Sequence, residues 1–347
     1  MNAKHQVPEG LLVLPRIRVQ NANAISSPLT HGFPSMTAFL GFMWALGRRL
    51  AAAGIPLKLE KVGVICHWYQ EQAQEGYVRT FHLTRNPVDK DGSTAAIVEE
   101  GRIHLDLTLV FQVSAIQRTN EVHFLFGSDE SMRRDIAWWI REQVGSMRLA
   151  GGSILPPKPA PGVRIAPTLV GWPDQENDQR ALFRRLRRQW LPGFALVSRE
   201  DLLRRRFESL QRENPDATLL DAWLDLSRFN WRSTRNDEGR VVWTHDRPEG
   251  AGWVVPIPGG YAALSDLYTG GQVVNARDQG TAFRFVEGVY SIGQWIGPHR
   301  LQRVQDCLWW GECHEDGLYR CCNGYGSPPE HADAQDPSDP LLSAENF

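Results

Sequence analysis

The sequence predicts an α+β fold of the ferredoxin-like type, in which two helices back a four-stranded antiparallel sheet. Two observations in the first half lead to this prediction. Residues 102–113 place apolar side chains at every second position, which is the period of a half-buried strand. Two helix-like segments, 36–46 and 129–144, separate the predicted strands in the order β-α-β-β-α-β.

The chain begins with a strand, a polar loop and a helix. Residues 11–19 are apolar and then alternate, which predicts the first strand. A loop rich in amide and hydroxyl side chains follows over residues 20–28. Ser35 or Thr37 can cap the next helix, and its apolar spacing predicts an inward face made of Phe39, Phe42, Met43 and Leu46.

The middle of the first half is predicted to be a hairpin with a protrusion. Residues 61–68 have the composition of a strand, and the alternating segment 77–84 is expected to pair with them. The polar segment 85–93 then leaves the sheet, with turn residues at Asp91-Gly92. The regular strand 102–113 follows this protrusion.

A glycine-rich stretch, residues 147–156, follows the second predicted helix and leads into a short strand. Gly151 and Gly152 lack a Cβ, so their backbone N–H groups can turn toward an anion, as in a phosphate-binding nest. Arg148 and Ser153 add a charge and a hydroxyl. The alternative is an ordinary helix end, a turn and the start of a strand, because short Gly-rich loops are weak signals.

The second half is predicted to be a separate helical and mixed region. Five prolines between Pro156 and Pro167 indicate a linker, so we place the domains at residues 1–160 and 161–326. Residues 327–347 are rich in Pro, Asp and Ser and are predicted to be disordered. The elements expected between are helices at 174–190, 199–214 and 218–229, a polar loop at 231–250, apolar segments at 253–261 and 283–290, and a helix from Pro298 to Trp309.

The overall composition is that of a soluble globular protein, with 42% hydrophobic and 22% charged residues. The net charge of −2 gives no global sign of a nucleic-acid partner, although arginines cluster at 184–188 and 204–206. We recognise no signal peptide, and prolines interrupt the stretch without charged residues between Arg18 and Arg48. We therefore expect a cytoplasmic protein that does not contact a membrane.

The five cysteines do not form a recognisable framework. An odd number without a secretory signal argues for a reducing compartment. Four of them gather near the C-terminus, and their spacing matches no paired Cys-x-x-Cys zinc site: Cys307, Cys313, Cys321 and Cys322. We predict no metal and no cofactor, and the sequence leaves the role of these cysteines open.

No familiar catalytic motif occurs in the sequence, which has no nucleophile elbow, P-loop, dinucleotide fingerprint or H-E-x-x-H zinc motif. His67, His82 and His104 fall on adjacent predicted strands. One of them, together with Tyr77, could carry out general acid–base cleavage of RNA. The alternative is that these histidines are partly buried strand residues. We assign no catalytic residue.

Residues suited to binding are better represented in the predicted loops. Arginine makes bidentate contacts to phosphate, and Asn or Ser can read base edges or a 2′-hydroxyl. Each of these residues alone could be an ordinary turn residue or cap. Gathered on one edge of a ferredoxin-like sheet, the set predicts RNA binding: Asn21, Asn23, Ser26, Ser27, Arg85, Asn86, Arg148, Gly151, Gly152, Ser153, Asn275 and Arg277. The aromatic RNP1 signature is absent, so we expect no base stacking on the sheet face.

Several long segments resemble one family, the second subunit of the type I-F (Csy) CRISPR surveillance complex, or Cascade. This is a RAMP-superfamily subunit of the Cas-five group. The resemblance spans about residues 11–320, and its clearest segments are 14–30, 32–34, 83–87, 91–102, 147–156, 191–200, 255–258, 275–278 and 298–300. The cysteine cluster from Cys313 to Cys322 and the acidic end after Ser327 fit the family poorly, so we transfer no function to them.

The resemblance implies a non-catalytic subunit in antiviral defence. It would pair with the large Csy subunit and hold the 5′ handle of the CRISPR RNA where the repeated backbone subunit begins. It also implies a thumb-like insertion at about residues 67–101 that pins the guide, and a Gly151-Gly152 loop that cradles handle phosphates. Target double-stranded DNA is expected to touch the chain only peripherally, near its PAM.

Two alternatives remain open at this point. Some relatives in other type I systems cut precursor RNA, so the chain could be a CRISPR-repeat endoribonuclease that uses His82 or His104. It could also be a protein-interaction scaffold whose Arg184–Arg188 helix binds an acidic partner.

Overall fold

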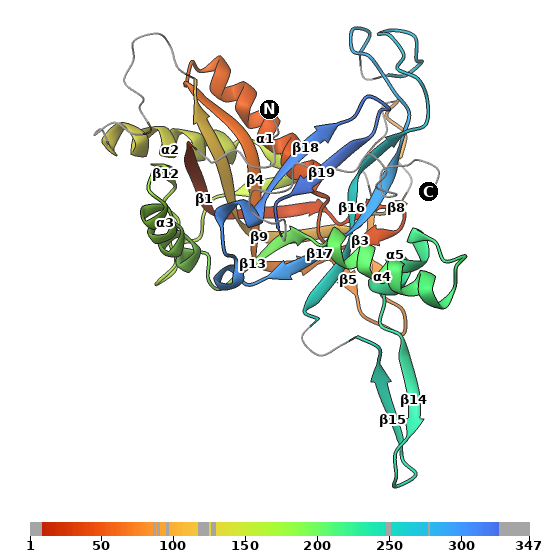
Figure 1. The fold of residues 1–347 in the computed structure, drawn as a ribbon. Coiled ribbons are helices and arrows are strands. Elements are labelled where there is room, and N and C mark those ends of the chain that lie inside the picture. The colour runs from red at the N-terminus through yellow and green to blue at the C-terminus, as the bar shows by residue number, and fades with distance from the viewer. Residues whose placement is uncertain are drawn as a thin grey trace.

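The computed structural model describes residues 9–85, 88, 91–94, 97–116, 125, 130–247, 251–276 and 278–325. These residues form an α+β fold built on one large antiparallel sheet (Figure 1), so the predicted α+β class is confirmed. The strands of this sheet are β1 (Gly10–Asn23), β4 (Leu57–Glu71), β9 (Arg102–Ala115), β10 (Arg148–Leu149), β11 (Gly152–Leu155), β12 (Thr168–Gly171), β13 (Phe194–Ser198), β16 (Trp253–Ala263), β17 (Val286–Ile296), β18 (Leu308–Cys313) and β19 (Tyr319–Asn323).

The strands follow the order β10-β11-β1-β9-β4-β13-β17-β16-β19-β18, and β12 pairs with the start of β1. The sheet is therefore larger than the predicted four strands, because β13 and β16 to β19 from the second half join it. β4 is the junction between the two halves. One of its edges pairs with β9, and the other is shared by β13 and β18. The predicted division at residue 160 stays a prediction.

Helices cover both faces of this sheet (Figure 1). They are α1 (Met36–Ala52), α2 (Glu130–Gly145), α3 (Glu176–Gln189), α4 (Glu200–Glu213) and α5 (Leu219–Ser227). Leu12 and Leu14 of β1 pack in one core with α1 and α2, whereas Leu11 and Val13 pack in another core with α3. Successive residues of β1 thus point to opposite, buried layers. A third core joins α4 and α5 to β16 and β17.

The helix α1 confirms the prediction made for it. Ser35 is its N-cap, and its hydroxyl accepts a hydrogen bond from the N–H of Thr37 at 3.3 Å. This bond satisfies one of the N–H groups that the first turn of a helix leaves without a partner. The predicted inward face is buried: Phe39, Phe42, Met43 and Leu46. No helix in the described part of the chain is long and apolar enough to cross a membrane.

Strand β1 contains two bulges that shape its second half. The register against β9 shifts between Leu14 and Ile17 and again between Val19 and Ala22. Arg16 (φ 54°) and Asn21 (φ 55°) adopt left-handed backbone conformations at these bulges. Such bulges bend a strand and redirect its side chains. The end of β1, which carries the predicted loop residues, is therefore turned away from a regular ladder.

The predicted hairpin between 61–68 and 77–84 is wrong. β4 pairs with β9, β13 and β18, so long-range partners occupy both of its edges. The described residues between β4 and β9 form two small sheets of their own, of β5 (Ala73–Gln74) with β6 (Thr80–Phe81) and of β7 (Leu83–Arg85) with β8 (Ile97–Glu99).

Two predictions in the second half are also wrong. The polar segment 231–250 was expected to be a loop, but it contains a hairpin of β14 (Trp231–Arg235) and β15 (Val241–His245). Every residue of both strands is exposed, so the apolar alternation that marks a half-buried strand is missing. The helix expected from Pro298 to Trp309 is broken into two 3-10 turns, η1 (Pro298–Arg300) and η2 (Val304–Cys307), before β18 begins.

The other helix predictions for the second half are confirmed by α3, α4 and α5, and the apolar segments belong to β16 and β17. The predicted disordered tail, 327–347, lies outside the described residues.

Candidate nucleic-acid interface

The glycine-rich stretch forms a tight hairpin of β10 and β11. Arg148 pairs with Ser153 and Leu149 with Gly152, which leaves Ala150 and Gly151 as a two-residue turn. Both turn residues have positive φ, 48° and 76°, as a type I′ hairpin turn requires. The side chain of Arg148 donates to the carbonyl of Gly151 at 2.6 Å. The two glycines therefore have different roles: Gly151 adopts the positive φ of the turn, and Gly152 is the first residue of β11.

Gly152 allows this hairpin to lie directly against the end of β1. A Cβ at Gly152 would stand 2.7 Å from both the backbone nitrogen of Ala22 and the carbonyl oxygen of Gln20. The backbone N–H of Asn23 donates to the carbonyl of Ala150 at 2.8 Å. The hairpin and the end of β1 therefore form one rigid edge of the sheet.

Asn21 and Asn23 are exposed on this edge. The backbone N–H of Asn21 donates to Nδ1 of His104 on β9 at 3.1 Å. The side-chain amide of Asn23 both donates to and accepts from the backbone of Ile25, at 2.7 and 3.1 Å. Asn23 therefore fixes the chain as it leaves the sheet, as Asn often does in turns.

The two predicted serines stabilise the next hairpin, formed by β2 (Ile25–Ser27) and β3 (Thr30–His31). The hydroxyl of Ser26 donates to the carbonyl of Phe33 at 2.9 Å. The hydroxyl oxygen of Ser27 accepts the N–H groups of Leu29 and Thr30. Both side chains make the local bonds of turn residues, and they stabilise the conformation of this hairpin.

The structure thus gathers eight of the predicted binding residues on two neighbouring hairpins and the strand between them: Asn21, Asn23, Ser26, Ser27, Arg148, Gly151, Gly152 and Ser153. Arg85 is the last residue of β7 in the insertion. Asn275 lies in a turn between β16 and β17 with φ 61°, in another part of the fold. Asn86 and Arg277 lie outside the described residues.

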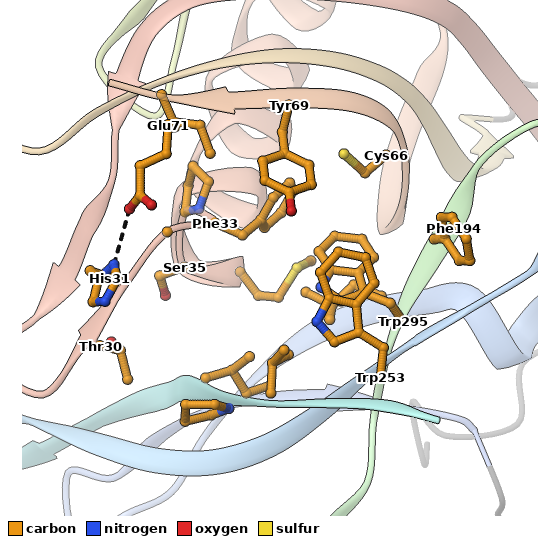
Figure 2. A pocket seen from close by; sticks show the side chains of 18 of the residues that line it. Thr30, His31, Phe33, Ser35, Cys66, Tyr69, Glu71, Phe194, Trp253 and Trp295 are labelled. Carbon is orange, nitrogen blue, oxygen red and sulfur yellow. Dashed lines mark hydrogen bonds and ion pairs between the residues drawn. The ribbon is translucent and has the colours of Figure 1, made fainter. Parts of the chain in front are cut away.

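An aromatic pocket with a volume of about 440 Å³ opens beyond the β2–β3 hairpin (Figure 2). Segments that are far apart in the chain line it, and its aromatic members are His31, Phe33, His67, Trp68, Tyr69, Phe194, Trp253 and Trp295. Tyr69, Phe194 and Trp253 are each about half exposed, at 50, 47 and 45%. The ring centroid of Trp253 lies 6.2 Å from that of Tyr69 and 6.1 Å from that of Phe194. The pocket therefore presents accessible ring faces.

One wall of the aromatic pocket is charged. Oε1 of Glu71 lies 3.0 Å from Nδ1 of His31 (Figure 2). The other oxygen lies 3.5 Å from the guanidinium of Arg79. The side chain of Glu71 is only 10% exposed. The pocket thus combines stacking surfaces with one hydrogen-bonding wall, which is the lining expected of a site for a planar, polar ligand.

The family of the chain is given by comparison with known proteins. Residues 12–321 match the family described as CRISPR-associated protein (Cas_Csy2). The chain belongs to this Csy2 family. It is 47% identical over 328 residues to the CRISPR-associated protein Csy2 of Pseudomonas aeruginosa (strain UCBPP-PA14), an alignment that covers 90% of this chain and 95% of that protein. The resemblance to the second Csy subunit is confirmed.

The aromatic pocket of this Csy2-family chain was not predicted from its sequence. The segment 253–261 stood out as apolar, but nothing local shows that it meets Phe194. They come together because β13 and β16 both pair with β17, and these pairings join residues that are far apart in the chain. Exposed aromatic residues at the ends of predicted strands were the one available signal.

The three histidines considered for catalysis do not lie on three adjacent strands. His67 is on β4 and His104 on β9, whereas His82 lies between β6 and β7. His67 is held at both ring nitrogens, with Nδ1 2.7 Å from the carbonyl oxygen of Pro192 and Nε2 2.7 Å from the hydroxyl of Thr108. Burial lowers the pKa of His67. A neutral imidazole fixed on both sides is a structural residue.

The cysteines of this Csy2-family chain are mostly buried. Burial raises the pKa of both Cys66 and Cys321 to about 12. Cys313 is exposed. Among the described residues, no group of three His, Cys, Asp or Glu side chains is placed to hold a metal ion.

Proposed function

We propose that this Csy2-family chain is a non-catalytic RNA-binding subunit of a type I-F CRISPR interference complex. It holds the 5′ handle of the CRISPR RNA and pairs with the large Csy subunit, at the point where the repeated backbone subunit begins. Target double-stranded DNA meets it peripherally, near the PAM. The observation on which this proposal rests is the membership of residues 12–321 in the Csy2 family.

The strand order supports a ferredoxin-like RAMP domain within the larger sheet. The neighbours β11-β1-β9-β4 come from the predicted β-α-β-β-α-β segment, with α1 between β1 and β4 and α2 between β9 and β11. In a ferredoxin-like fold the first and third strands are central, as β1 and β9 are here. We propose that this domain spans residues 1–160, that its thumb is the insertion at about 67–101, and that a mixed region covers 161–326.

The edge formed by the end of β1 and the β10–β11 hairpin is the proposed handle site. Asn21, Asn23, Arg148 and Ser153 are exposed on it, and their backbones are fixed by hydrogen bonds. A guanidinium and exposed amide and hydroxyl groups on a rigid backbone suit a phosphate chain with 2′-hydroxyls. The insertion carrying Arg85 and Asn86, and the loop carrying Asn275 and Arg277, complete the proposed contacts.

The aromatic pocket supports single-stranded RNA rather than a duplex. Sequence-specific RNA recognition usually stacks unpaired bases on aromatic side chains and hydrogen-bonds their edges. The pocket offers the half-exposed rings of Tyr69 and Trp253, and Glu71 beside them. We propose that an unstacked base of the handle enters it.

Co-expression with the large subunit and a CRISPR repeat RNA tests this function. A stable complex in which the 5′ handle resists nuclease is the expected result. A chain that purifies alone, with no RNA and no handle protection in the presence of the large subunit, contradicts the proposal.

The endoribonuclease alternative is tested on the same material. In the structure Nδ1 of His104 accepts the backbone N–H of Asn21, and His82 is exposed between β6 and β7. Purified chain is incubated with repeat RNA, alone and with the large subunit. Uncut RNA supports the binding role, whereas cleavage that is lost in His82→Ala or His104→Ala supports the nuclease.

The scaffold alternative concerns helix α3. Arg184, Arg185 and Arg188 are exposed on it, while Arg187 donates to the carbonyl of Leu301. Charge reversal at the three exposed arginines should leave handle protection intact if they form a solvated face. Loss of the complex with retained RNA protection supports a protein-docking helix.

A further inference from the structure

The β14–β15 hairpin projects from the body of the protein as an arm (Figure 1). Residues 229–247 make up this arm, and every residue of its two strands is exposed. An isolated two-stranded hairpin is at best marginally stable in water. An arm of this kind is expected to gain contacts from a ligand that it binds.

One face of the arm is a row of aromatic side chains. The register places Trp231 opposite His245 and Ser233 opposite Trp243, so both tryptophans lie on the same face. Trp231 and Trp243 are 56 and 61% exposed. Diagonal neighbours of this kind stand roughly 7–8 Å apart, which is within reach of aromatic side chains, so the two rings form one continuous aromatic surface. Phe229 extends the row, with its ring 5.4 Å from that of His245.

The charge of the arm is positive along its strands. Neither β14 nor β15 contains Asp or Glu. Arg235 of β14 lies on the same face as the tryptophans, and Arg232 lies on the opposite face. At its root the arm borders a groove of about 980 Å³ lined by six arginines: Arg199, Arg205, Arg206, Arg232, Arg247 and Arg300. Arg232 and Arg300 are exposed. This surface attracts a polyanion.

The two carboxylates in the groove lining hold the root of the arm. Asp225 accepts from Nε of Arg206 at 2.6 Å and from the side-chain amide of Asn230 at 3.3 Å. Asp246 accepts the backbone N–H of Asn230 at 3.2 Å. Arg247 donates to the carbonyls of Leu226 and Val254. These bonds fix where the arm leaves the body. Arg199 and Arg205 pair with Asp201, which leaves the exposed Arg232 and Arg300 for a ligand.

We propose that the arm and its arginine groove bind a single strand of RNA, with bases stacked on Trp231 and Trp243 and phosphates on the arginines. Stacking rings combined with a basic groove form the usual surface for single-stranded nucleic acid. The exposed hydroxyl of Ser233, on the same face as the two tryptophans, can bond to a 2′-hydroxyl, which favours RNA over DNA. An apolar protein partner would leave the exposed Arg232 and Arg300 without counter-charges.

This surface is separate from the proposed handle site. Five strands lie between β11 and β16, the strand that follows the arm. The inference rests on the proposed RNA-binding function and adds a second contact to it. One RNA molecule that occupies both surfaces must therefore span the distance of these five strands.

The test uses the purified full-length chain and a fluorescein-labelled single-stranded RNA of about twelve nucleotides that lacks the handle sequence. The double variant Trp231→Ala, Trp243→Ala should weaken binding about tenfold or more, measured by fluorescence anisotropy. Trp44→Ala, at a tryptophan of α1 that is 71% exposed, is the matched control and should change the affinity by less than about twofold. Replacing Arg232 and Arg300 by Gln should reduce the slope of log K against log salt by about 1.4.

Unchanged affinity in the tryptophan double variant overturns the inference, and so does equal or tighter binding of single-stranded DNA of the same sequence. A photo-crosslinking amino acid at position 243 gives a second measurement in an otherwise unaltered chain. Crosslinks to RNA in the complex are expected, and crosslinks to protein alone overturn the inference in favour of a protein-docking arm. Handle protection by the arm variants reports separately on the proposed function, because it depends on the edge around Arg148.

Discussion

The backbone N–H of Asn23 donates to the carbonyl of Ala150 at 2.8 Å, which joins the end of the first strand to a hairpin turn more than a hundred residues later. This bond is possible because β1 is bulged at Val19–Ala22 and because Gly152 lets the hairpin approach. The two segments that the sequence marked as candidate RNA contacts thereby form one surface. Its rigidity rests on backbone geometry, so it should respond to changes that alter no charge.

Gly152→Ala should destabilise the protein by about 1–3 kcal/mol. Its Cβ would meet backbone atoms of Ala22 and Gln20 at 2.7 Å, and backbone cannot move aside as a flexible side chain can. Gly41→Ala is the control, since Gly41 lies in α1 with open space around it. It should stabilise by about 0.5–1 kcal/mol through helix propensity. Urea unfolding measures the change in the free energy of unfolding for both variants. The same stability in the Gly152→Ala and Gly41→Ala variants would show that the hairpin does not pack as closely as described.

Arg148→Ala should weaken binding of handle RNA by about 1–3 kcal/mol, because charge-assisted hydrogen bonds to phosphate are lost. Arg148→Lys keeps the charge but not the planar fork, so it should restore only part of the affinity. Binding is measured in the complex with the large subunit at several salt concentrations. Arg184→Ala removes an exposed arginine of α3 and should have little effect. Equal losses in the Arg148 and Arg184 variants would mean that only general charge is being measured.

Local patterns predicted the elements of the first half correctly where one face of a segment is buried. α1 and β9 are examples, since α1 buries one apolar face and β9 places alternate apolar residues from Ile103 to Val113 in the same core. The same reasoning failed at β14 and β15, because these strands bury no face and show no alternation. It failed at Leu308–Trp310 for a different reason. This short apolar run follows a segment that begins with a proline, so its sequence predicts a helix. In the structure it is a strand, because it pairs with Val62 and Gly63 of β4.

The site was predictable only where its residues are neighbours in sequence or belong to adjacent elements. The end of β1 and the β10–β11 hairpin meet because both belong to the predicted β-α-β-β-α-β segment. The aromatic pocket depends on β13 pairing with both β4 and β17, and such pairings between distant segments leave no periodic trace in either segment. Trp253 and Tyr69 could not have been placed together from the sequence.

Arg141→Met should destabilise the protein by about 3 kcal/mol. Arg141 of α2 is buried and donates to the carbonyls of Pro15 at 2.7 Å and Arg16 at 3.2 Å. These carbonyls belong to the first bulge of β1, and without the guanidinium they are left buried and lacking this donor. Arg134→Met, on the exposed side of the same helix, should stay within about 0.5 kcal/mol. Chemical unfolding measures both, and a neutral Arg141→Met would show that water replaces the guanidinium.

Cys313 should react with a maleimide or an aromatic disulfide far faster than the other cysteines of the native chain. It is exposed, whereas Cys66, Cys307 and Cys321 are buried. Burial raises the pKa of Cys66 and Cys321 to about 12, so almost no thiolate is present there at neutral pH. Mass spectrometry after brief labelling should find the modification at Cys313, and Cys313→Ser should abolish the fast phase. Fast labelling of Cys321 would contradict the described packing of β19.

His67 should make the protein less stable as the pH falls below about 6.5. Burial holds the pKa of His67 below its ordinary value of 6.5, although the carbonyl of Pro192 partly opposes this. Below pH 6.5 the unfolded chain therefore binds a proton that the folded chain refuses, and the free energy of unfolding falls until the folded pKa is reached. In that window the loss approaches about 1.4 kcal/mol per pH unit. His67→Gln can retain bonds to Pro192 and Thr108 but cannot titrate, so its stability should fall less between pH 6.5 and pH 5. Urea unfolding across this range, with His31→Gln as an exposed control, checks the difference, and parallel curves for the chain and its His67 variant would contradict it.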